Sequence, residues 1–184
     1  LSGPLNAPRI VTLWNLDETE MQINGILHKK KGVKGTFESD LKLNEGQSLI
    51  FNQFVFSFPS LTLSGQGSFN STGNGVFKAS IAASPFNLSS LPNGLIFLDK
   101  VLNQGAIEFS LNVDGKGKDW RGWNKNGWIK LTDGVLIPKG LNDPISNILL
   151  HLKLDRHVAE VKRLEFNIKQ SKARIIGQIR NWET

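Results

Sequence analysis

The feature that most constrains this chain is a strict alternation of apolar and polar side chains in its second half. In the first such segment, Ile107, Phe109 and Leu111 are separated by single polar residues. The same period of two recurs over residues 148–155, 164–169 and 173–180. A β-strand sends successive side chains to opposite faces, whereas a helix would scatter these residues around its axis. The pattern therefore predicts strands of a sheet that has one apolar face.

The first half of the chain repeats this pattern and adds an aromatic stripe. Phe54, Phe56 and Phe58 fall on one side of a predicted strand, and Phe77 and Ile81 fall on one side of a later strand. Residues 10–14 are apolar on both sides, which predicts a strand at a sheet edge or inside a sandwich. Residues 21–27 alternate as well and predict one further strand.

One segment departs from the β pattern. Leu91, Leu95, Leu98 and Leu102 recur at helical spacing, and Gly105 offers a C-terminal stop. We expect one amphipathic helix here, packed on the apolar face of the sheet. The predicted fold is mainly β: a single domain, residues 1–184, with a long, twisted, antiparallel sheet of about ten strands and one helix.

Two local signals refine this prediction. Asp143 followed by Pro144 is a helix cap and first-turn pair, so we expect a single helical turn before the strand at residue 148. Asp133 and Gly134 interrupt the strand over residues 128–137, where we expect a bend.

The charge of the chain is moderately basic, with 22 Lys and Arg against 16 Asp and Glu and a formal net charge of +6. This favours acidic partners weakly. The basic residues are spread along the chain, so we expect no nucleic-acid partner. The only run, Lys29, Lys30 and Lys31, is flanked by glycines and is predicted to be a solvated turn.

Candidate catalytic groups do not converge. The chain has no cysteine, and its histidines, His28, His151 and His157, lack the spacing of a metal site. Nucleotide-binding glycine motifs are absent as well. We therefore expect neither an enzyme nor a bound metal or cofactor.

Basic and aromatic residues interleave in one polar connection. Trp120, Arg121 and Trp123 could stack sugars or bases, with Lys118 and Lys125 beside them. Alternatively, these side chains hold a long loop against the sheet.

The continuous apolar face has two interpretations. It is either an ordinary core, covered by the helix and a second sheet, or an open trough that accepts acyl chains. The candidate groove-lining residues are Phe54, Phe56, Phe58, Phe77, Ile81, Phe109, Leu111, Leu150, Leu152, Phe166 and Ile168.

The order of several short segments resembles the AsmA-like superfamily of bacterial envelope proteins. The segments are PFNLSSL from Pro85, GAIEFSLNVDG from Gly105, NGWIKLTDGVLIP from Asn126, GLNDPISNI from Gly140 and IIGQI from Ile175. The likeness is best over residues 59–182. Each motif is degenerate, and their order carries the resemblance.

The resemblance implies a β structure with a hydrophobic groove that conducts phospholipid between the inner and outer membranes and supports outer-membrane integrity. It also implies a periplasmic segment of a protein anchored in the inner membrane, with possible partners in the envelope. The chain itself has no apolar run of about 18 residues. It also opens without an initiator Met, so we expect a mature chain or a piece of a longer protein. The alternative is a structural, glycan-binding or protein-binding β module of the cell envelope.

Overall fold

The computed structural model describes residues 8–23, 27–44, 48–72, 75–97, 102, 104–117, 123–138 and 143–180. Within these ranges the chain forms thirteen strands, which confirms a mainly β fold. The strands are β1 (Arg9–Asn15), β2 (Met21–Ile23), β3 (Leu27–Lys29), β4 (Thr36–Asn44), β5 (Ser48–Phe58), β6 (Leu61–Asn70), β7 (Val76–Asn87), β8 (Leu95–Phe97), β9 (Gln104–Lys116), β10 (Asn124–Leu136), β11 (Ile145–Asp155), β12 (Val158–Ile168) and β13 (Ser171–Arg180).

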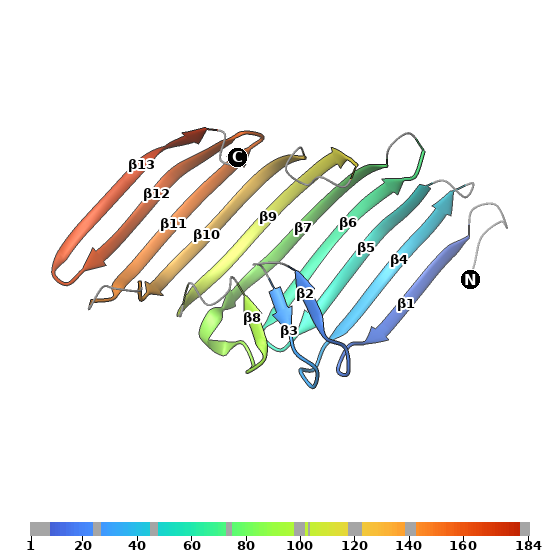
Figure 1. Ribbon diagram of the computed structural model, residues 1–184, viewed down its shortest axis with the longest axis horizontal. Helices are drawn as coiled ribbons and strands as arrows, with labels where there is room; N and C mark the ends of the chain where they lie inside the picture. Colours follow the sequence, from blue (N-terminus) through green and yellow to red (C-terminus); the bar gives the residue numbers. More distant parts are fainter. Residues whose placement is uncertain are drawn as a thin grey trace.

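Ten of these strands form one large antiparallel sheet in the order β1-β4-β5-β6-β7-β9-β10-β11-β12-β13. Each strand therefore pairs with the next member of the sheet along the chain, as in a meander (Figure 1). The predicted number of about ten strands is confirmed for this sheet. Strand β1, apolar on both sides in sequence, lies at one edge, and β13 lies at the other.

The three short strands β2, β3 and β8 form a separate small sheet. The chain leaves the large sheet twice to build it, once between β1 and β4 and once between β7 and β9. Figure 1 shows the small sheet in front of one end of the central strands. It brings Leu27 and Leu95 against Phe58, Ile107 and Leu131 of the large sheet, and this contact forms the buried core.

The amphipathic helix predicted around residues 91–102 is wrong. A single 3-10 turn, Leu88–Ser90, precedes this segment, and the described part of the segment contains the strand β8. A turn at Gly94, with φ of 97°, ends any helical path, and pairing of β8 with β3 then satisfies the backbone hydrogen bonds. Leu91 and Leu95 still pack on the core, but from an extended chain. Leu98 lies outside the described residues.

Two shorter expectations are also corrected. The segment over residues 21–27 is not one strand, because β2 and β3 are separate and pair with each other as Met21 opposite Lys29. No helical turn follows Asp143. The chain enters β11 at Ile145, where the ladder with β12 already supplies backbone partners.

The predicted bend at Asp133 and Gly134 is confirmed. The register of β10 with β9 and with β11 shifts at this point, and Asp133 has a left-handed φ of 52°. Such a bulge turns the strand and changes which face each side chain occupies. Because of the bulge, Gly134 lies on the same face as Leu131, three residues earlier, and both residues are buried on the core side of the sheet.

Candidate functional site

All eleven predicted groove residues lie on one face of the large sheet, which we call the apolar face. Directly opposed residues in an antiparallel ladder point to the same side. The register opposes Phe56 to Phe37, and Ile81 to Leu111. Continuing strand by strand, it aligns Phe54, Phe56, Phe58, Phe77, Ile81, Phe109, Leu111, Leu150, Leu152, Phe166 and Ile168.

These candidates divide into two groups, those that pack in the core beneath the small sheet and those that lie outside it. Phe58 belongs to the buried core, and Phe56, Phe109, Leu150 and Phe166 are half-buried against it. The other six lie outside this core: Phe54, Phe77, Ile81, Leu111, Leu152 and Ile168. The small sheet leaves the rest of the apolar face uncovered, and in Figure 1 no other described strand lies in front of that part. The core interpretation thus holds for one end of the strands.

Strand β5 joins the covered and the uncovered parts through its aromatic rings. The ring centroids of Phe56 and Phe58 are 6.4 Å apart, and those of Phe54 and Phe56 are 6.2 Å apart. Phe51 continues the series, with its ring 6.3 Å from that of Phe54 in an edge-on arrangement. Phe37 on β4 packs on Phe56 at 4.4 Å. The rings therefore form one contiguous surface along the strand.

Glycines on neighbouring strands allow aromatic rings to lie flat on the apolar face. A Cβ atom at Gly65 would stand 2.5 Å from Cζ of Phe54, and one at Gly115 would overlap the indole ring of Trp123. The rings occupy the space that a side chain would need, as in aromatic rescue of glycine in sheets. This explains why Phe54 is half-buried although it lies outside the core.

The structure places Trp123 on the apolar face. Its ring lies 5.2 Å from that of Phe77, and its indole nitrogen is buried with no hydrogen-bond partner in the described part of the chain. The other two members of the predicted stacking site, Trp120 and Arg121, lie outside the described residues. The contacts of Trp123 favour the interpretation in which this side chain holds its connection against the sheet.

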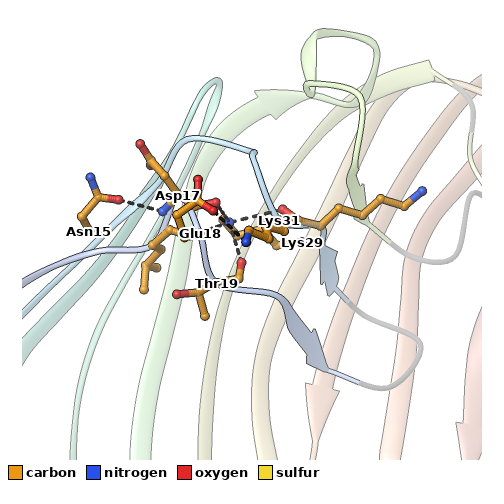
Figure 2. Close-up of polar contacts among 8 residues, drawn as sticks. Asn15, Asp17, Glu18, Thr19, Lys29 and Lys31 are labelled. Atoms are coloured by element: carbon orange, nitrogen blue, oxygen red, sulfur yellow. Dashed lines mark hydrogen bonds and ion pairs between the residues drawn. The ribbon is translucent and has the colours of Figure 1, made fainter.

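The prediction of a solvated lysine run is wrong for Lys29. Its side chain is completely buried, and its ammonium donates hydrogen bonds to the carbonyl oxygens of Leu16 at 2.6 Å and Thr19 at 2.8 Å (Figure 2). Lys30 and Lys31 are exposed, as predicted. The buried ammonium fastens the turn after β1 to the small sheet, which is a structural role.

A second charged cluster centres on Glu165, on the opposite, polar face. This carboxylate is buried beneath Arg163, Lys172 and Arg174, whose nitrogens lie 3.0, 3.3 and 3.6 Å from its oxygens. The hydrogen bond from Arg163 holds the pKa of Glu165 below its ordinary value, although burial acts in the opposite direction. The cluster ties β12 to β13.

The described residues contain no group of three His, Asp or Glu side chains that could hold a metal ion. His28 lies 3.1 Å from Glu20, His151 points from β11 to the polar face, and His157 lies in the turn before β12. Nor is any helix in the described ranges long and apolar enough to cross a membrane.

Comparison with family models, with curated proteins and with solved structures finds no match to this chain. The fold therefore defines a class only, a mainly β protein built on a ten-stranded antiparallel sheet.

Sequence reasoning missed the polar-face residues Trp128, Lys130 and Lys153. The structure brings them together as neighbours on β10 and β11. Their outward orientation could have been read from the alternation of Trp128 and Lys130 with Ile129 and Leu131.

Proposed function

We propose that this protein is a non-enzymatic periplasmic segment that binds or conducts phospholipid acyl chains along the uncovered part of its apolar face. The observation that supports this most directly is that the small sheet covers much less area than the apolar face of the large sheet. The apolar face continues over ten strands, whereas the core with the small sheet occupies one end of it. Beyond the small sheet and Trp123, no described segment packs over this face, and a large contiguous apolar surface of this kind is typical of a binding surface.

The dimensions of the sheet suit an acyl chain. Strands lie about 4.8 Å apart, so ten strands span about 43 Å. A bilayer core of about 30 Å holds two layers of acyl chains, so one extended chain is about 15 Å long. Such a chain would cross three or four strands, and several chains would fit side by side.

The chemistry of the surface also suits a flexible apolar ligand. The uncovered candidates are large aliphatic and aromatic side chains, and each CH₂ group that they shield from water contributes about 0.8 kcal/mol. Part of this is offset by the ordering of the ligand. The resemblance to the AsmA-like superfamily adds the biological setting: transfer of phospholipid between the two membranes, a membrane-anchored full-length protein and support of outer-membrane integrity.

The test uses delipidated protein and a fluorescent phospholipid, separated by gel filtration. Wild-type protein is expected to retain the lipid. Phe69 and Ile175 point to the apolar face and are 42% and 48% exposed, so Phe69→Glu with Ile175→Glu places charge on that surface at tolerated positions. We expect this variant to lose most of the retained lipid at an unchanged thermal midpoint.

Strand β13 offers a matched control. Ile176 is 63% exposed and points to the polar face, as does Val11 on β1 at 71%. Val11→Glu with Ile176→Glu adds the same charge and should leave lipid retention intact. Wild-type protein that emerges free of lipid, or equal retention by the two variants, would refute the proposal.

A further inference from the structure

A second candidate surface lies on the polar face, where β10, β11 and β12 run side by side (Figure 1). Trp128, Lys130, His151, Lys153 and Lys162 line a shallow open depression of about 670 Å³. The register opposes Trp128 to Lys153 and Lys130 to His151, so these side chains emerge from adjacent, hydrogen-bonded strands. A site on paired strands is held more precisely than one on a loop.

The cations around the tryptophan differ in their partners. The Lys130 ammonium lies 4.6 Å from the centre of the Trp128 ring and 2.9 Å from the Glu108 carboxylate. Lys162 pairs with Glu160 at 2.8 Å. Lys153 is exposed and lies opposite Glu160 in the ladder between β11 and β12, but within the described ranges it is Lys162 that forms the ion pair with this carboxylate. An arriving anion therefore meets one ammonium outside any ion pair and two whose exposed ion pairs are weak enough to exchange.

The surrounding charge reinforces this preference. Residues 124–184 carry 11 Lys and Arg against 6 Asp and Glu, whereas residues 1–123 carry 11 against 10. On the polar face, Arg163, Lys172 and Arg174 continue the basic surface beyond the depression and share the single carboxylate of Glu165. Within the depression, Glu108, Glu160 and Asp155 balance the three lysines, so the positive potential that raises the local concentration of anions comes from this neighbouring basic surface.

The side chains of the depression indicate the class of anion. A half-buried indole flanked by ammonium groups offers a flat apolar platform for one sugar ring and cations for the acid groups beside it. Single-stranded nucleic acid normally stacks on several large aromatic rings, whereas this depression contains one indole and the smaller imidazole of His151. A membrane surface calls for protruding apolar side chains, and Leu154, the one aliphatic residue of the lining, is buried.

We propose that this depression binds an acidic polysaccharide, with a sugar ring on Trp128 and carboxylate groups on Lys153, Lys130 and Lys162. The site is on the face opposite the proposed lipid surface, so the two proposals stand or fall separately. Asn126 and Asp155 at its rim supply hydrogen-bonding groups for sugar hydroxyls.

The experiment is a titration of the full chain with alginate, a polyuronate, measured by isothermal titration calorimetry at low and at physiological salt. Binding to alginate is expected, and binding to uncharged dextran is not. Lys153→Gln should weaken alginate binding about tenfold, the usual effect of losing one charged hydrogen bond. Trp128→Ala should weaken it by a similar factor, and Trp128→Phe should restore most of the affinity because the ring is retained.

Lys42 provides the matched control. It is exposed on the polar face of β4, which is the second strand from the β1 edge and far from β11 in the sheet order. Lys42→Gln removes the same charge. This variant should bind alginate as the wild type does. Equal weakening by Lys42→Gln and Lys153→Gln would show general charge attraction and overturn the proposal. Binding of an oligonucleotide or of anionic phospholipid vesicles as tightly as alginate would overturn it as well.

Discussion

Replacing the buried lysine should destabilise the protein far more than replacing either of its neighbours. The ammonium of Lys29 makes its two shortest hydrogen bonds with the carbonyl oxygens of Leu16 and Thr19, at 2.6 and 2.8 Å. Lys29→Met keeps the unbranched apolar part of the side chain, ends where the ammonium would begin, and removes both bonds. A hydrogen bond to a charged group contributes about 1.5 kcal/mol or more, so the loss should be about 3 kcal/mol.

The measurement is urea unfolding followed by tryptophan fluorescence. With a denaturant slope of about 2–3 kcal/mol per molar urea, a loss of this size lowers the midpoint by about 1–1.5 M. Lys30→Met is the control, because Lys30 is exposed next to Lys29 and surface substitutions usually change stability by less than about 0.5 kcal/mol. Two variants with the same midpoint would show that the carbonyl cage around Lys29 contributes nothing, and the reasoning would be refuted.

Two further predictions concern the large sheet. The pKa of Glu165 is lowered in the folded state, so its ionised form contributes stability that is complete above the ordinary pKa of about 4.3 and is lost as the pH falls through the lower folded value. The urea midpoint of Glu165→Gln should therefore lie below that of the wild type at pH 7 and approach it at pH 3; a constant difference would contradict this. Gly127 has a φ of 149°, and a Cβ atom there would collide with the carbonyl oxygen of Ser110. Gly127→Ala should therefore lower stability by about 1–3 kcal/mol in the same assay, and an unchanged midpoint would contradict the strain.

Between bulges, the face of a strand residue could be predicted from sequence, because alternation is a local property. Phe109, Leu150 and Phe166 lie far apart in the chain, yet each was assigned correctly to the apolar face. The sequence signal for the bend at Asp133 is also local. A turn residue within an otherwise regular strand is enough to indicate it.

The small sheet could not be predicted in the same way. Leu91 and Leu95 have helical spacing, and their actual contacts depend on pairing with β3, more than sixty residues earlier in the chain. Such non-local pairing leaves no local signal. The burial of Lys29 was missed for the same reason, since its carbonyl partners come from the turn after β1.

The polar-face depression falls between these cases. The orientation of Trp128 follows from alternation alone, but its place beside Lys153 requires the meander order of β10 and β11.

The even number of strands in the large sheet has a practical consequence. Strand β1 begins at Arg9 and β13 finishes at Arg180 at the same end of the sheet, and the small sheet lies at the other end. Coupling to a solid support beside either residue would therefore hold the molecule upright, with the small sheet directed away from the support. In that orientation a flowing solution reaches both broad faces, and lipid and glycan capture can be compared on a single immobilised sample.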